Sequence, residues 1–393
     1  MNRTRIGGLL AASFFFWGAL YLYVPSLAEY VKSHVSSLAV VGVVLSMYGL
    51  WQGVVRIPLG IVVDATGRGK PYLIAGFLLA ALGAAIMGVS HTASGLTLGR
   101  ALTGVAAGTW VPMIVIFAGF FPPEQAVFAT SLLTFSSSFG QVVATSMTGL
   151  LNQTGGYRLS FDLAVVAALL AVVVMAVTRL APAAGSAGGS PLPRRPTSFA
   201  SILAVFGRRD VLAPSFAGAV LQFGNWAVVF GFLPLLAKQV GATDVTTGLL
   251  VSTAVVAGAL SNLVTTFVAN RIRMRASLVA SFGLFAGGIA LAAVAHTVGL
   301  LFVSTIVIGI ATGFGYPALM GLSIQRVETD RRTTAMGIHQ AVYSIGMFAG
   351  PWIGGIIAEH MGIRAMFAMT AAFCFVAASL LVMLYPRSSV AVQ

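Results

Sequence analysis

The chain has 393 residues, of which 58% are hydrophobic and only 8% are charged, and its net charge is +13. This composition leaves too little polar surface for a water-soluble protein of this size and predicts an all-α membrane protein. The positive charge would suit a nucleic-acid-binding protein, but its placement, described below, excludes that class.

Twelve apolar runs are long enough to cross a bilayer as helices, which takes about 20 residues each. The first run follows Arg3 and Arg5 and resembles a signal peptide, but it continues without a convincing cleavage site, so we interpret it as the first span. The predicted spans are residues 6–29, 38–63, 71–92, 94–121, 127–152, 159–181, 211–237, 245–269, 276–297, 299–325, 334–359 and 363–385.

The basic residues gather on one side of these spans. With the N-terminus in the cytoplasm, sixteen Lys and Arg residues fall on the cytoplasmic side and four on the outer side. This asymmetry predicts a multi-pass protein of the cell membrane with both termini in the cytoplasm. We therefore expect anionic membrane lipids as contacts and no nucleic-acid partner.

Residues 182–209 are rich in Gly, Ser and Pro and predict a flexible cytoplasmic linker. This linker divides the spans into an N-terminal six-helix bundle, residues 1–181, and a C-terminal six-helix bundle, residues 210–393. The halves also resemble each other at offsets of 205, 206 and 209 residues. Gly104, Gly108 and Pro112 match Gly309, Gly313 and Pro317; Gly156, Arg158 and Phe161 match Gly362, Arg364 and Phe367; and Pro25 matches Pro234. Such a repeat predicts two bundles related by pseudo-twofold symmetry, with a cavity between them at mid-membrane.

The loop GIVVDATGRGK between the second and third spans resembles the loop signature of the major facilitator superfamily (MFS), although Ala65 replaces a usual basic residue. The matching residues are Gly60, Asp64, Gly67, Arg68 and Lys70. The resemblance implies the MFS fold and a charged cluster around Asp64 that latches the two bundles in the outward-facing state. The alternative is that the loop serves topology alone, through Arg68 and Lys70.

Two further segments carry a similar resemblance. Arg100, followed by Gly104, resembles the arginine of the family's second motif, which is often tied to proton coupling; a structural hydrogen bond to the first span is the alternative. Gly350 and Pro351 in GPWIGG resemble an antiporter motif in an unusual span, and we expect them to bend that helix.

All nine acidic residues lie in loops or near span ends, so no carboxylate is expected at mid-membrane. Arg56 lies about 12 Å deeper than Asp64 at helical rise. Its side chain either snorkels to the cytoplasmic face or binds an anionic or polar substrate in the cavity. His339 is the one mid-span residue of a type that ordinarily titrates near neutral pH, and it is either a packing residue or a proton carrier, which would make H+ the coupling ion.

Polar and aromatic residues on the cavity-facing spans of the family predict a mixed pocket. The candidate substrate-binding residues are Trp17, Tyr21, Tyr48, Gln52, Arg56, Trp110, Gln141, Gln222, Asn225, Trp226, Asn262, Tyr316, His339 and Tyr343.

We interpret the chain as a secondary active transporter that moves a small organic solute by rocker-switch alternating access. No nucleotide-binding loop, metal-spaced cluster or catalytic group is present in the sequence, so we expect no enzyme activity, no cofactor and no metal. One hypothesis for the solute is an organic anion bound by Arg56. The alternatives are a proton-coupled exporter of amphipathic drugs and a lipid-handling flippase on the same fold. We expect the transporter to be a monomer.

Overall fold

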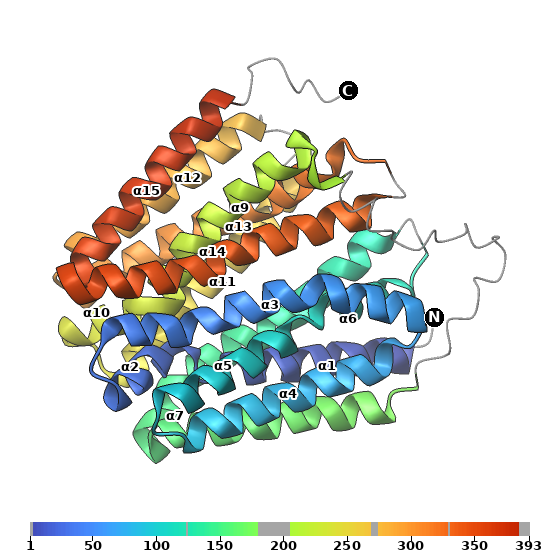
Figure 1. Cartoon of the computed structure of the whole chain (residues 1–393), viewed down its shortest axis with the longest axis horizontal. Coiled ribbons are helices and arrows are strands. Elements are labelled where there is room, and N and C mark those ends of the chain that lie inside the picture. Colours follow the sequence, from blue (N-terminus) through green and yellow to red (C-terminus); the bar gives the residue numbers. More distant parts are fainter. Residues whose placement is uncertain (1–2, 123–124, 180–204, 269–273, 329–330, 385–393) are drawn as a thin grey trace.

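The computed structural model describes residues 3–122, 125–179, 205–268, 274–328 and 331–384, and its elements in this part of the chain are all helices (Figure 1). In chain order they are α1 Arg3–Tyr21, α2 Val24–His34, α3 Leu38–Thr66, α4 Gly69–Val89, α5 Ala93–Ala107, α6 Trp110–Ala118, α7 Ala126–Val177, α9 Arg209–Ala227, the π-helix η2 Val228–Phe232, α10 Leu233–Gln239, α11 Asp244–Val268, α12 Met274–Val294, α13 Val298–Gln325, α14 Arg332–Met361 and α15 Ile363–Leu384.

The helices agree with the twelve predicted spans. Within the described ranges, ten helical segments are long and apolar enough to cross a membrane. One of them, Phe128–Val177, is 50 residues long, and a kink at Gly156, where φ is 68°, divides it into two spans. The apolar helix α15 lies at the position of the predicted last span, and its segment Ile363–Ala377 is shorter than the ten.

Two of the spans are interrupted along their length. The first passes from α1 to α2 at Leu22 and Tyr23, and the seventh passes from α9 to α10 through the π-helical turn η2. Pro25 and Pro234 lie in the first turn of the helix that follows each break. Proline is tolerated there because the N–H that it lacks would have no partner within the helix.

The predicted repeat recurs in the backbone. Gly156 and Gly362, which are 206 residues apart, both have left-handed φ angles, 68° and 87°. A Cβ added at Gly104 of α5 would lie 2.6 Å from the Tyr48 carbonyl of α3, and one added at Gly309 of α13 would lie 2.5 Å from the Ala254 carbonyl of α11. Equivalent glycines therefore bring equivalent helices together in both halves.

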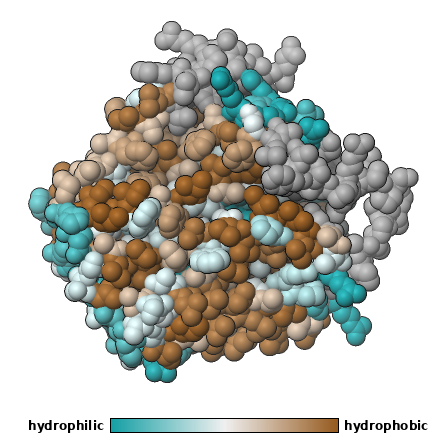
Figure 2. Space-filling model, viewed as in Figure 1, coloured by the Kyte–Doolittle hydropathy of each residue, from teal (hydrophilic) through white to brown (hydrophobic). Residues whose placement is uncertain are grey.

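The helices form two bundles, an N-terminal bundle of α1–α7 and a C-terminal bundle of α9–α15, which meet along α3 with α14 and α7 with α11 (Figure 1). The predicted linker, residues 182–209, falls mostly outside the described residues, and its boundaries stay a prediction. Figure 2 shows apolar side chains along the sides of the helices and hydrophilic ones gathered toward their ends. Large apolar side chains such as Phe128 and Phe135 are exposed on the surface of the protein, as expected where a helix faces lipid.

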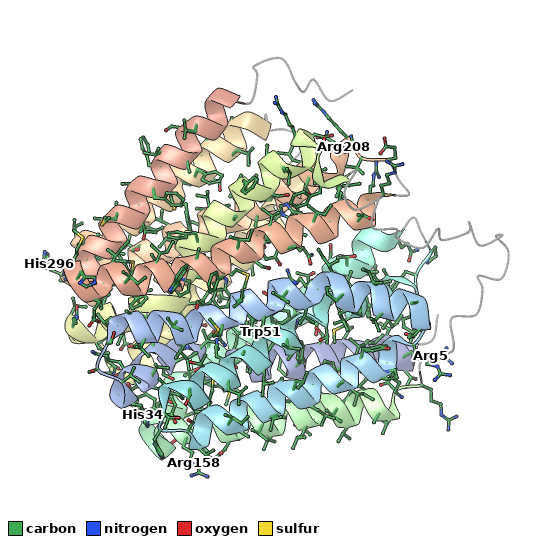
Figure 3. The ribbon with its side chains drawn as sticks, viewed as in Figure 1. Arg5, His34, Trp51, Arg158, Arg208 and His296 are labelled. Carbon is green, nitrogen blue, oxygen red and sulfur yellow. The ribbon has the colours of Figure 1, made fainter. Side chains whose placement is uncertain are left out.

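The two ends of the bundles carry different charged residues. Figure 3 shows Arg5 and Arg208 at the end where α1 begins and α15 ends, which we call the termini side. His34 and His296 lie at the opposite end, which we call the far side.

Candidate functional site

A cavity of about 310 Å³ lies between the two bundles. Its lining comes from α1, α3, α6 and α7 on one side and from α9, η2, α11, α13 and α14 on the other. The volume is at the lower end of the range of small-molecule sites, which indicates a small ligand.

Thirteen of the fourteen candidate substrate-binding residues line this cavity. The exception is His339, which is fully buried on α14 beside Tyr343, with ring centroids 5.8 Å apart. Its Nδ1 lies 3.1 Å from Ser215 Oγ, while its Nε2 has no hydrogen-bond partner. His339 is therefore a neighbour of the cavity wall and not part of the lining.

The cavity also includes residues that the sequence did not single out, such as Ser138, Thr312 and Phe230. Phe230 lies within the π-helical turn η2. A turn of this kind is frequent at functional sites, but it has no sequence signal in a uniformly apolar segment.

Arg56 lies in the cavity and joins the two bundles. Its side chain is 4% exposed, Nη1 donates a hydrogen bond to Tyr343 Oη of α14, and the guanidinium carbon is 5.0 Å from the centre of the Tyr343 ring. Its Nε is buried and has no partner. The snorkelling alternative is therefore wrong in this structure, because the guanidinium points into the interior instead of extending to the surface.

Arg56 is the one formal charge among the described lining residues. None of the ion pairs formed by described residues includes Arg56. The guanidinium thus contacts the Tyr343 hydroxyl and ring, but no carboxylate of the lining balances its charge.

Arg100 is a second buried cation, 1% exposed, and lies behind the cavity wall. Its guanidinium carbon is 4.4 Å from the centre of the Tyr48 ring and 5.8 Å from that of Trp226, which belongs to the other bundle. Tyr48 and Trp226 stack at 4.9 Å. Cation–π contacts therefore replace an ion pair here, and they connect Arg100 to the contact between the bundles.

Two glycine contacts close the cavity on the far side. A Cβ added at Gly42 of α3 would lie 2.9 Å from Gly355 Cα of α14, and one added at Gly248 of α11 would lie 3.1 Å from Gly149 N of α7. Gly42 and Gly248 are 206 residues apart, and so are Gly149 and Gly355. The contact between α3 and α14 and the contact between α11 and α7 are therefore equivalent under the pseudo-twofold symmetry.

Polar contacts add to this closure. Glu359 of α14 accepts a hydrogen bond from the backbone N–H of Leu38, the first residue of α3, and Lys238 Nζ of α10 lies 3.6 Å from Glu29 Oε1 of α2. The structure is therefore closed on the far side.

We predict that Glu359→Gln weakens the far-side closure. Because a carboxylate at a helix N-terminus contributes about 0.3–1 kcal/mol, the open population should rise by roughly twofold to fivefold. The measurement is the labelling rate of Ser138→Cys by an impermeant maleimide applied to the far side. The control is His360→Gln at the neighbouring exposed residue, which should leave the labelling rate at the wild-type value. A wild-type labelling rate in Glu359→Gln would contradict the prediction.

The segment GPWIGG lies where α14 touches both neighbours. Gly350 lies against the backbone of Phe223 in α9, and Pro351 presents its carbonyl to Gly42 of α3. The helix α14 continues through Pro351 from Arg332 to Met361. The segment therefore allows close helix packing on both sides of α14.

The segment that ends α3 and begins α4 has a structural role that the sequence did not suggest. Gly67 ends α3 with φ of 62°, and Lys70 Nζ donates to the carbonyls of Ala176 and Thr178, at 2.8 and 3.0 Å. These carbonyls end α7, where a cation is favourable. The side chain of Asp64 lies outside the described residues, and the latch stays a prediction.

Lys70→Met should lower the free energy of unfolding by about 0.3–1 kcal/mol, because the last carbonyls of α7 lose their cation. The measurement is the Tm of the purified protein in detergent. Lys70→Arg keeps the charge and should retain most of the wild-type Tm. Equal Tm values for Lys70→Met and the wild type would contradict this role.

Comparisons with known proteins agree with this architecture. The family model described as Major Facilitator Superfamily matches residues 9–223 and 215–392. The chain is 36% identical over 89 residues to the inner membrane transport protein YajR of Escherichia coli, over 22% of this chain and 19% of that protein. It is 28% identical over 181 residues to the multi-drug resistance efflux pump PmrA of Streptococcus pneumoniae, over 44% of each chain. These alignments thus span less than half of either relative.

A similar solved structure is that of a bacterial homologue of the human lysosomal transporter Spinster, in an inward-facing and unoccupied conformation. The TM-score is 0.79 at 16% identity, over 98% of this chain and 97% of that one. At this identity the likeness extends to the fold alone.

Proposed function

The chain belongs to the major facilitator superfamily, and on that premise we propose that this multi-pass membrane transporter carries a small organic anion, which binds Arg56 in the cavity between the bundles. The cargo crosses the membrane by alternating access. The two bundles rock about the cavity, and the far-side closure opens as the termini side closes.

The observation that carries the proposal is the unbalanced charge of Arg56. Its guanidinium is buried in the cavity between the bundles, its Nε has no partner, and the lining residues include no carboxylate. A permanent cation in such surroundings is costly unless something pairs with it. An anionic cargo supplies that partner, and a guanidinium binds a carboxylate through two parallel hydrogen bonds.

The placement of charges supports the proposed orientation. Arg5 and Arg208 lie on the termini side (Figure 3), so the positive-inside rule favours that side as cytoplasmic. The described state is then inward-facing. We also propose H+ as the coupling ion, with His339 as the candidate carrier because its Nε2 lies unpaired beside Tyr343, which binds Arg56.

Export of amphipathic drugs is the second candidate. The name of the relative PmrA and the aromatic residues of the cavity favour it. Arg56 would repel the cationic drugs of this class, and its partnerless Nε favours an anion instead.

The test is a thermal-shift screen of the purified protein, since a ligand that binds the folded state raises the Tm. We expect organic monocarboxylates to raise the Tm in a concentration-dependent way and cationic amphipathic drugs to leave it unchanged. The effect should be lost in Arg56→Gln. Stabilisation by the cationic drugs alone would reject the anion proposal in favour of the second candidate.

A further inference from the structure

A continuous row of six aromatic rings lines the cavity, with members from both bundles. Neighbouring ring centroids lie 4.9–6.0 Å apart, within the range of favourable aromatic pairs. In order along the row the rings are those of Trp110, Trp17, Tyr21, Phe230, Trp226 and Tyr48.

Three polar atoms of the lining residues are buried without a partner. They are the donors Nε1 of Trp17 and Nε of Arg56 and the acceptor Oε1 of Gln52. Buried polar groups are nearly always hydrogen-bonded, and a buried Trp N–H usually finds an acceptor. Of the nine such atoms among the described residues, these three belong to the cavity lining, where a ligand would supply their partners.

The guanidinium of Arg56 is already oriented for such a ligand. Nη1 is held by Tyr343 Oη, which leaves the edge that carries Nε for an incoming group. A carboxylate fits a guanidinium edge of this kind through two parallel N–H···O bonds.

We propose that the cargo is an aromatic carboxylate of one or two rings, with its carboxylate on Arg56 and its ring against the row of aromatic side chains. This inference rests on the proposed function, because it assumes that Arg56 binds an anion. The cavity volume of about 310 Å³ limits the size of the ligand to this range. A ring substituent that donates a hydrogen bond, such as a phenolic hydroxyl, matches the free Oε1 of Gln52.

The test is isothermal titration calorimetry of the purified wild-type protein with three ligands of similar size. Benzoate has both the ring and the charge, cyclohexanecarboxylate has the charge without an aromatic ring, and benzamide has the ring without the charge. Because aromatic contacts are worth more than their buried area alone, benzoate should bind about threefold to tenfold more tightly than cyclohexanecarboxylate. Benzamide should bind at least tenfold more weakly than benzoate.

The outcomes separate the two proposals. Equal affinities for benzoate and cyclohexanecarboxylate would overturn the aromatic cargo while leaving the anion transporter intact. Equal affinities for benzoate and benzamide would overturn the anion transporter itself. A failure of benzoate to bind at all would overturn the aromatic cargo, whichever carboxylates stabilise the protein in the thermal-shift screen.

A variant pair localises the effect. Trp226→Leu removes a ring of the row and should reduce the preference for benzoate over cyclohexanecarboxylate to less than twofold. Trp51→Leu removes an exposed Trp of α3 that does not line the cavity and should keep the preference. A preference that persists in Trp226→Leu would contradict the assigned ring contact; if that variant fails to fold, the three-ligand comparison on the wild type decides alone.

Discussion

In the Arg56→Gln variant, the affinity for an organic monocarboxylate should fall by about 10- to 150-fold. Hydrogen bonds to a charged group contribute about 1.5–3 kcal/mol, and the glutamine retains neither the charge nor the two-pronged geometry. Arg56→Lys keeps the charge but not the geometry of the guanidinium, so its affinity should lie between those of Arg56→Gln and the wild type. The measurement is the dissociation constant from calorimetry, with benzoate as the ligand.

Two controls separate binding from folding in this series. Tyr343→Phe removes the hydrogen bond that orients Arg56 but leaves the charge of Arg56 in place. We expect the affinity for benzoate to fall by about twofold to tenfold. Arg364→Gln removes an arginine that donates to the Ala293 carbonyl outside the cavity and should bind benzoate as the wild type does. Wild-type affinity in a folded Arg56→Gln variant would reject Arg56 as the anion site.

Substitution of leucine for Gly355 should drive the bundles apart on the far side. The added side chain meets the backbone of Gly42, and forcing extra atoms into a packed contact costs about 1–3 kcal/mol. The closed population should therefore fall by roughly 5- to 150-fold relative to the open one. Gly149→Leu at the pseudo-symmetric contact with α11 should act in the same direction.

The measurement is the distribution of distances between spin labels at Ser36 and His296, exposed far-side residues of the two bundles. The native Cys374 is buried and does not compete for the label. Gly287→Leu in α12 supplies the matched control, because nothing lies within 4 Å of an added Cβ there. An unchanged distribution in folded Gly355→Leu would show that the glycine contacts do not govern the closure.

Hydrophobic run length and charge placement predicted the spans, because the bilayer imposes length and polarity on each segment independently of its neighbours. The breaks in the first and seventh spans were not predicted. A helix that is apolar all round has no periodic pattern that a break would interrupt, and only Pro25 and Pro234 hinted at them.

The cavity lining was largely predictable because polar and aromatic side chains are rare in these spans and face the interior when they occur. His339 shares a helix face with Tyr343, one turn away, yet only Tyr343 reaches the cavity. The two residues differ in their position along the axis of α14, and the spacing of residues in the sequence does not show where along the helix the cavity lies. Gly42 and Gly355 show a related limit, since the choice of contact partners depends on how two bundles meet in space.

Uptake into proteoliposomes tests the central claim most directly. Purified protein is reconstituted, and the accumulation of radiolabelled benzoate is followed for the wild type, Arg56→Gln and Arg364→Gln. The account predicts saturable uptake by the wild type and Arg364→Gln and none above protein-free vesicles by Arg56→Gln. Uptake by Arg56→Gln at the wild-type rate, or no uptake by the wild type of benzoate or of any carboxylate that raises its Tm, would contradict an anion carrier built around Arg56.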